Sequence, residues 1–252
     1  MRLRLQWASV LDRWDARLRR VGERLGVPQP WLQEFNAYLG DRTTLEEFWV
    51  RYTLKRLDVQ PWLQKITTEE DALAFYRESD YLLWRNLVHR RHSAWRRVLV
   101  TMRGKKGQLV EYGCGIAPVS AWLHRRTAWS FWLIDFTGPA REFAHTRLAK
   151  WSHWSDTPQW EYWKTQIRWP FARVVTALDV LEHTADPVYT VMRLERALVP
   201  GGYLHWNFIE ASETSEGLNL ATAAQRQETL DYLYTHLRLI WSSPDHLVSQ
   251  KP

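Results

Sequence analysis

Two glycines and an acid stand at a spacing that suits the binding of a nucleotide. Gly113 and Gly115 follow an apolar run over 109–112, and glycine lets a backbone approach a ligand where a Cβ would collide. Asp135 comes 22 residues after Gly113. An acid at that distance ends the neighbouring strand and accepts hydrogen bonds from both ribose hydroxyls. The alternative role for Asp135 is to cap the helix that begins near Pro139.

A second polar group follows the β-branched run 172–177. Asp179 and His183 come shortly after this run, at the end of a strand where open α/β sheets bind ligands. Histidine titrates near neutrality, so His183 is a candidate general base, with a structural role as the alternative. Asp179 is either a ligand contact or a hydrogen-bond acceptor at the end of the sheet.

The glycine loop departs from a dinucleotide-binding loop, which needs a third glycine to seat its helix on a pyrophosphate. The chain has Pro118 at that place, and it has Glu111 two residues before Gly113. Both features point away from NAD and towards a smaller, cationic nucleotide. Glu111 either orients the loop, meets an ammonium group through water or accepts hydrogen bonds from a helix. Cys114 inside the loop suits a small buried position better than a nucleophile.

The elements that must position these residues alternate between strands and helices. Apolar runs predict strands at 108–112, 129–135, 160–164 and 172–177, and a fifth after Pro200-Gly201-Gly202. Pro118 opens a helix directly after the glycine loop. A helix over 221–236 precedes two short strands, at 237–241 and 246–249, that a tight turn joins.

The first hundred residues predict helices only. Apolar residues at helical spacing run through 1–25, and arginines lie between them. This helix packs on the core or another subunit, or lies on a membrane surface. Helices are also expected within 30–57, after the Thr67-Thr68 pair, and over 81–102.

Four segments together resemble a known family. Glu111-Tyr112-Gly113-Cys114-Gly115-Ile116-Ala117 resembles the first motif of class I S-adenosylmethionine-dependent methyltransferases, and Asp135 stands where the family has its acid. Leu178-Asp179-Val180-Leu181-Glu182-His183 is similar to the Asp-Val-x-Glu-His motif of methyltransferases related to ubiquinone biosynthesis. Leu198-Val199-Pro200-Gly201-Gly202 resembles the family's Leu-x-Pro-Gly-Gly turn. The resemblance covers residues 105–252.

The resemblance implies an α/β fold with a Rossmann-like seven-stranded sheet, mostly parallel with a C-terminal antiparallel hairpin. This domain would span 104–252, beneath an N-terminal all-helical cap over 1–103. The implied cofactor is S-adenosyl-L-methionine, and His183 is the candidate catalytic residue, with no metal. The cofactor-binding candidates are Glu111, Gly113, Cys114, Gly115, Asp135, Phe136 and Asp179. Thr165-Gln166 follows the strand expected at 160–164, where the family often has an acidic residue against the adenine amine.

The implied reaction is in-line methyl transfer to a small molecule or glycan. Residues 1–106 hold 21 Lys and Arg against 13 Asp and Glu, whereas 107–252 hold 13 against 15. An RNA or protein acceptor bound by the basic cap is therefore the alternative. A further alternative is a non-catalytic binding module. A nicotinamide-dependent oxidoreductase is disfavoured by Pro118.

Composition sets broader limits. One cysteine in the chain excludes an internal disulfide and a cysteine-clustered zinc site. No apolar run is long enough for a membrane span, and a cytoplasmic protein is expected. Five of the 17 tryptophans fall within 151–169, where they pack in the core or stack on a planar ligand. The oligomeric state is not predicted.

Overall fold

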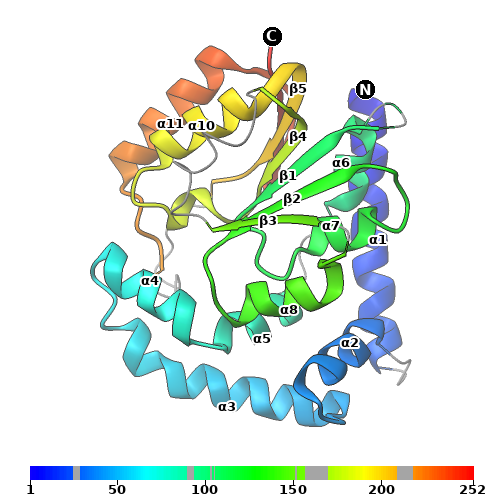
Figure 1. The fold of residues 1–252 in the computed structure, drawn as a ribbon, viewed down its shortest axis with the longest axis vertical. Helices are drawn as coiled ribbons and strands as arrows, with labels where there is room; N and C mark the ends of the chain where they lie inside the picture. Colours follow the sequence, from blue (N-terminus) through cyan, green and yellow to red (C-terminus); the bar gives the residue numbers. More distant parts are fainter. Residues whose placement is uncertain are drawn as a thin grey trace.

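A seven-stranded sheet organises the computed structural model (Figure 1), which describes residues 1–24, 29–89, 94–102, 104, 106–150, 152–156, 170–208 and 218–252. The strand order is β3-β2-β1-β4-β5-β7-β6. The strands are β1 (Gln108–Tyr112), β2 (Ser130–Asp135), β3 (Ser152–Asp156), β4 (Ala172–Ala177), β5 (Leu198–Trp206), β6 (Arg238–Ser243) and β7 (His246–Gln250).

The first five strands are parallel, and β7 pairs antiparallel with both β5 and β6. The parallel part is buried on both faces, which explains why β1 and β4 read as continuous apolar runs. The predicted Rossmann-like sheet with a C-terminal hairpin is confirmed.

The third strand differs from its predicted place. The segment predicted, 160–164, lies outside the described residues, and the strand that pairs with β2 is Ser152–Asp156. Its residues, Ser-His-Trp-Ser-Asp, are mostly polar because β3 is the edge strand. An apolar pattern could not reveal it. Its His153 ring stacks on Trp132 of β2, with ring centroids 4.5 Å apart.

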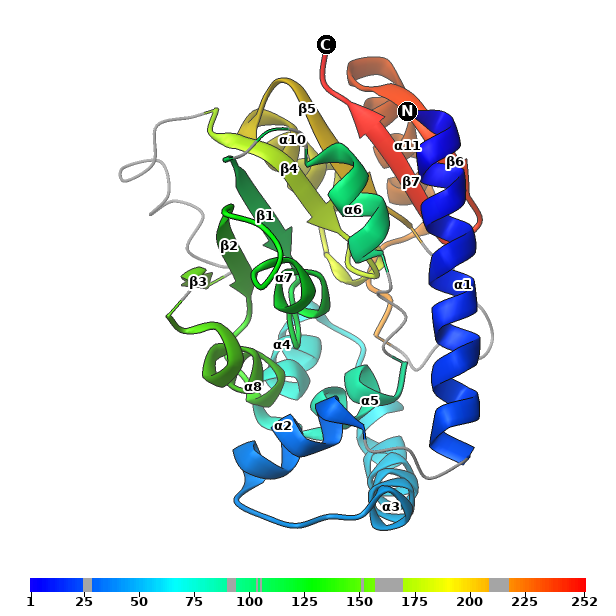
Figure 2. The same cartoon turned by 90° about the vertical axis from the view of Figure 1, so that its right-hand side faces the viewer.

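Helices cover both faces of the sheet (Figures 1 and 2). On one face α10 (Pro187–Ala197) and α11 (Ala223–His236) pack against Val110 and its neighbours. On the other face α6 (Trp95–Thr101), α7 (Pro118–Leu123) and α8 (Pro139–Leu148) pack against Leu109. Consecutive residues of β1 therefore belong to the two cores.

The remaining helices are α1 (Arg2–Arg24), α2 (Pro30–Leu39), α3 (Leu45–Leu63), α4 (Glu69–Glu78) and α5 (Tyr81–His89). Two of them begin at capping boxes, formed by Thr44 with Glu47 and by Thr68 with Asp71. Helices α2 to α5 lie beyond the carboxyl ends of the parallel strands (Figure 1). Their aromatic core includes Phe143 of α8, so the helical region and the sheet share packing.

Helix α1 runs along the side of the molecule, next to α6 and β6 (Figure 2). Among the described helices, none has both the length and the apolar content needed to cross a bilayer.

Candidate functional site

The loop after β1 turns sharply at two glycines with positive φ. Gly113 has φ +63°, and a Cβ there would overlap the side chain of Val180, which follows β4. Gly115 has φ +49°, and a Cβ there would lie 3.0 Å from Nδ2 of Asn86 in α5. Glycine is therefore required by neighbouring parts of the chain as well as by backbone conformation. The loop is enclosed by the loop after β4 and by the helical region.

Glu111 holds the glycine loop against the helix that follows it. Its two carboxylate oxygens accept hydrogen bonds from the backbone amides of Val119, at 3.2 Å, and Ser120, at 2.8 Å. These amides belong to the first turn of α7 and have no partner within the helix. Burial raises the pKa of Glu111 to about 7, against the effect of these hydrogen bonds. Of the roles considered for Glu111, the structure shows that of a hydrogen-bond acceptor for backbone amides of α7.

Asp135 joins the end of β2 to the glycine loop. Its Oδ2 accepts a hydrogen bond from the amide of Gly115, and its Oδ1 accepts one from the amide of Phe136 at 2.7 Å. Burial raises the pKa of Asp135 to about 6. Each carboxylate oxygen has two lone pairs, so each retains acceptor capacity for a ligand hydroxyl. The acid predicted from spacing thus lies directly against the predicted glycines.

Asp179 is held in a strained conformation at the end of β4. Its φ is +56°, which is uncommon for a residue with a Cβ. Asn207, directly after β5, fixes it twice. The Asp179 amide donates to Oδ1 of Asn207 at 2.6 Å, and Nδ2 of Asn207 donates to Oδ1 of Asp179 at 2.5 Å. No sequence signal identified Asn207 as part of this group.

His183 ends a short 3-10 helix, Leu181–His183, and has a fixed tautomer. Its Nδ1 lies 2.8 Å from the carbonyl oxygen of Leu218. A carbonyl only accepts, so Nδ1 carries the proton and Nε2 of the neutral ring has the free lone pair. Burial lowers the pKa of His183 to about 4, so the ring is neutral at pH 7.

Tyr76 of α4 brings the helical region into the site. The sequence analysis did not identify this residue as a candidate. Its ring centroid lies 6.0 Å from that of Phe136 and 6.4 Å from that of His183. Burial raises the pKa of its hydroxyl, and the carboxylates of Asp135 and Glu182 add to this effect. Tyr76 lies in an ordinary helical pattern, so only the packing of α4 on the sheet reveals it.

The remaining candidate, Cys114, has its side chain in the core formed with α6 and α7. Burial raises the pKa of this thiol well above its usual value, which disfavours a nucleophilic thiolate. Within the described ranges, no three His, Cys, Asp or Glu side chains group as a metal site would require. The structure therefore gathers Glu111, Gly113, Gly115, Asp135, Phe136, Asp179 and His183 at the carboxyl ends of β1, β2 and β4.

Comparison with solved structures finds similarity to several methyltransferases. An O-methyltransferase family protein from Burkholderia thailandensis is 14% identical with a TM-score of 0.57, over 84% of this chain and 73% of that one. The N-methyltransferase NodS from Bradyrhizobium japonicum WM9, in complex with S-adenosyl-L-homocysteine, is 18% identical with a TM-score of 0.46. The match covers 68% of this chain and 88% of NodS.

The CurJ carbon methyltransferase is 13% identical with a TM-score of 0.48, over 72% of this chain. The chain spans 58% of the length of that CurJ structure. A search of curated proteins finds no match.

Family membership rests on the sequence of more than half of the chain. A family model described as a methyltransferase domain matches residues 87–241, from the end of α5 to β6. The match includes the glycine loop, Asp135 and His183. The chain belongs to this methyltransferase domain family.

Proposed function

We propose that this protein is an S-adenosylmethionine-dependent methyltransferase that acts on a small molecule or glycan. The observation that carries the proposal is the contact between Asp135 and the amide of Gly115. It places an acid with remaining acceptor capacity beside a glycine loop at the carboxyl edge of parallel strands, where α/β sheets bind nucleotides. The methyltransferase domain family to which the chain belongs supports the choice of this methyl-donor cofactor.

The residues present fit this cofactor. Asp135 would accept hydrogen bonds from the ribose hydroxyls, and Phe136 and Tyr76 would supply apolar surface beside it. The backbone of the loop Gly113-Cys114-Gly115 would contact the cofactor. The side chain of Cys114 would not, because its thiol is buried. Glu111 would act indirectly by holding the loop against α7. Asp179, fixed by Asn207, would close the opposite side.

The bound cofactor supplies a methyl group that its sulfonium has already activated. The protein then needs to position the acceptor and exclude water. His183 would take a proton from a hydroxyl or amine acceptor through Nε2, because Nδ1 is committed to Leu218. Its lowered pKa keeps Nε2 free of a proton at neutral pH but also makes it a weak base. An acceptor whose own proton is acidic suits such a base best.

A small acceptor is favoured because the helical region encloses the loop, with Asn86 next to Gly115. The similar structures include O-, N- and carbon methyltransferases, and the proposal covers oxygen, nitrogen and carbon acceptors. An RNA or protein acceptor on the basic helical region, over residues 1–103, is the second candidate. We retain a cytoplasmic location as part of the proposal, since the one cysteine is a free thiol.

Calorimetry with S-adenosyl-L-homocysteine tests the cofactor. We expect micromolar binding by the wild type and a loss of about tenfold or more in Asp135→Ala, which removes an acceptor of charge-assisted hydrogen bonds. Asp231→Ala is the matched control, because Asp231 is an exposed acid of α11. Absence of heat from the folded wild type would end the proposal, and equal affinity of both variants would remove Asp135 from the site.

Transfer of a radiolabelled methyl group into cell extracts tests the acceptor class. We expect label in the small-molecule fraction, unchanged by prior treatment with RNase or protease. Label that disappears after either treatment would establish the second candidate instead.

A further inference from the structure

Helix α1 turns its apolar side away from the protein. Its residues Leu3, Trp7, Leu11, Trp14, Leu18 and Val21, spaced three or four apart along α1, are between 51% and 71% exposed. We call these six residues the outer stripe. The side that packs against the protein contains Leu5, Ala8 and the acid Asp12. An amphipathic surface helix normally buries its apolar stripe, so α1 is reversed. The helix does pack on the core, through Leu5, but most of its apolar residues face away from it.

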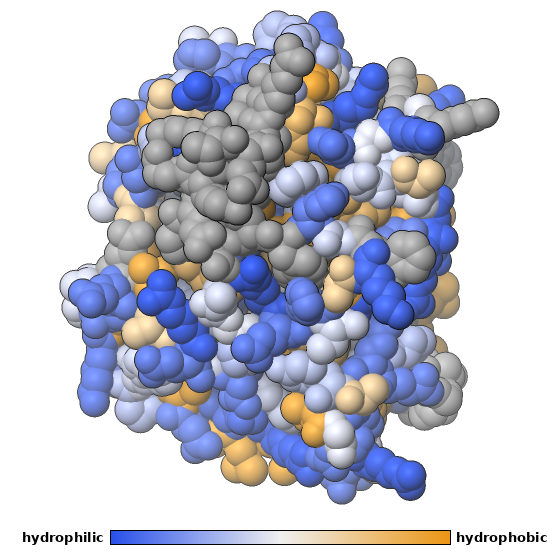
Figure 3. Space-filling view, viewed as in Figure 1, coloured by the Kyte–Doolittle hydropathy of each residue, from blue (hydrophilic) through white to orange (hydrophobic). Residues whose placement is uncertain are grey.

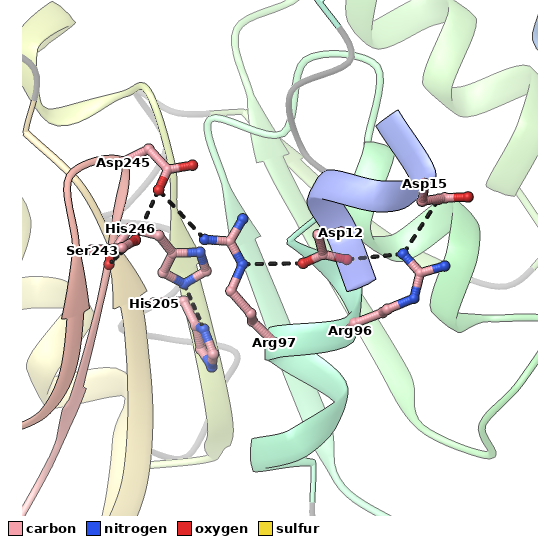
Figure 4. Close-up of polar contacts among 8 residues, drawn as sticks. All are labelled: Asp12, Asp15, Arg96, Arg97, His205, Ser243, Asp245 and His246. Atoms are coloured by element: carbon pink, nitrogen blue, oxygen red, sulfur yellow. Dashed lines mark hydrogen bonds and ion pairs between the residues drawn. The ribbon is translucent and has the colours of Figure 1, made fainter. Parts of the chain in front are cut away.

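A buried ion-pair network fixes α1 in this orientation (Figure 4). One oxygen of Asp12 lies 3.2 Å from Nε of Arg97, and the other lies 2.9 Å from Nη1 of Arg96. Asp15 adds a contact of 3.3 Å to Arg96, and Nη1 of Arg97 lies 3.7 Å from Asp245 before β7. Rotating α1 to bury the outer stripe would carry Asp12 towards solvent and leave the buried guanidinium of Arg97 without this partner, which is strongly destabilising. The outer stripe therefore stays exposed in the folded protein.

Arginines border the outer stripe. Arg13 and Arg17 are exposed, and the guanidinium of Arg17 lies 5.8 Å from the ring centroid of Trp14. The helix has seven arginines and three acids, and two of the acids, Asp12 and Asp15, are neutralised by Arg96 and Arg97. The side that faces solvent is thus apolar with a basic border.

We propose that α1 is a membrane-docking helix that lies on a bilayer surface containing anionic lipids. The two tryptophans and four aliphatic residues would enter the interface, and the arginines would meet phosphate groups beside them. Interfacial helices combine these features: an apolar face, tryptophan, and basic residues that anionic lipids attract. Charge decides against a second copy of the chain as the occupant. Two copies would bring their arginine borders together, whereas anionic headgroups complement them.

Flotation of the full-length protein with lipid vesicles tests this docking. We expect binding to vesicles of phosphatidylcholine with 30 mol% phosphatidylglycerol. The partition coefficient for vesicles of phosphatidylcholine alone should be lower by about tenfold or more. The variant Trp7→Ser/Trp14→Ser should lower the partition coefficient at least about tenfold, since it removes the largest apolar groups of the outer stripe. The variant Arg13→Gln/Arg17→Gln should lower it about tenfold on anionic vesicles only.

A matched control comes from another helix with exposed apolar residues. Val50, Leu54 and Leu57 of α3 are each more than half exposed, and hydrophobic residues gather over α3 at the lower edge of the molecule (Figure 3). Val50→Ser/Leu54→Ser should leave flotation unchanged. Circular dichroism and urea unfolding should show that all variants keep the stability of the wild type, because the substituted side chains are exposed.

Three results would overturn the proposal. They are no flotation of the folded wild type, an equal loss in the α3 control, and a stable dimer that Trp7→Ser/Trp14→Ser dissociates without vesicles. The last result would make a second copy the occupant. Binding of S-adenosyl-L-homocysteine should be unchanged in these variants, so the outcome is independent of the proposed catalytic function.

Discussion

Two buried polar clusters of this protein both contain acids and histidine and differ in what those residues bind. The candidate site has Glu111, Asp135 and His183 at the carboxyl edge of the sheet, and these side chains bond to backbone groups. The second cluster, between α1, α6 and the β5-β7 pair (Figure 4), bonds side chain to side chain. Burial and histidine occur in both, so neither alone marks a functional site.

The second cluster leaves little chemistry free. Thr101 donates its hydroxyl proton to the carbonyl of Val98, so it accepts from Nε2 of His205, 2.8 Å away. His205 then accepts at Nδ1 from Nε2 of His246, at 2.9 Å. Burial lowers the pKa of His205 to about 3, with a further contribution from Arg97. Both ring nitrogens of His205 are engaged within the protein, whereas His183 uses only Nδ1 in its hydrogen bond to Leu218. The contrast predicts stability effects in one cluster and functional effects in the other.

The largest expected effect is on stability, at Arg97. Arg97→Leu removes one of the two arginines that compensate the buried Asp12 and should lower the free energy of unfolding by about 3 kcal/mol or more. Urea denaturation measures this. Arg51→Leu, which breaks the exposed 2.6 Å pair with Asp41, is the control and should cost less than about 1 kcal/mol. Equal losses would mean that the buried network does not hold α1.

The two histidines should separate turnover from stability. His183→Asn retains a donor for the Leu218 carbonyl but removes the base, so methyl transfer should slow about 100-fold. Affinity for S-adenosyl-L-homocysteine should stay within about twofold. His205→Asn should lower the midpoint of urea unfolding and leave turnover per folded molecule unchanged. The assignment of the two clusters would be reversed if His205→Asn slowed turnover and His183→Asn left turnover unchanged.

Gly113 and Gly40 form a pair that separates backbone strain from overlap. Their φ values are +63° and +67°, but a Cβ meets Val180 at Gly113 and nothing within 4 Å at Gly40. Gly40→Ala should cost about 1 kcal/mol and Gly113→Ala about 2 kcal/mol or more in unfolding free energy. Val180→Ala in the Gly113→Ala background should recover the difference. If the two single variants lose the same amount, Val180 does not press on the glycine loop.

The last effect concerns the dependence of stability on pH. The pKa of Glu111 rises from 4.5 in the unfolded chain to about 7 in the fold, so the folded state favours the protonated acid. Its contribution to stability is complete below pH 4.5 and is lost as the pH rises through 7. Relative to Glu111→Gln, the wild type should lose unfolding free energy on the order of 1 kcal/mol for each pH unit between these two pKa values.

Thermal melts from about pH 3 to 8 test this sign. Glu47 is the control, because hydrogen bonds from Thr44 lower its pKa. Its contribution is present above pH 4.5 and is lost as the pH falls below that value. The difference in stability between the wild type and Glu47→Gln should therefore change with pH in the opposite direction to that for Glu111→Gln. The same direction in both variants would contradict the assignment for Glu111.

Much of the fold and site followed from local pattern. The strands at β1, β2 and β4, the helix at Pro118 and the C-terminal hairpin lie where apolar runs and turn residues predicted them. The spacing from Gly113 to Asp135 predicted an acid at the end of the neighbouring strand, and Asp135 ends β2, which pairs with β1. The edge strand β3 was missed because its residues are polar.

Other parts of the site have no local signature. Tyr76 and Asn86 sit in ordinary helical patterns, and only the packing of α4 and α5 against the sheet places them beside Phe136 and Gly115. Asn207 becomes the partner of Asp179 because β4 and β5 are adjacent and parallel, so the residues after them meet.

Local sequence patterns indicated the family, most of the strands and helices, and the edge of the sheet where the polar residues gather. These follow from periodicity, turn chemistry and spacing, which act over short stretches of chain. Only the tertiary structure decided which face of α1 is buried. The apolar pattern favours burying Trp7 and Trp14, but the structure leaves them exposed and pairs Asp12 with Arg97, 85 residues away. Leaving a buried charge without its partner is strongly destabilising, and no local pattern within α1 contains that distant partner.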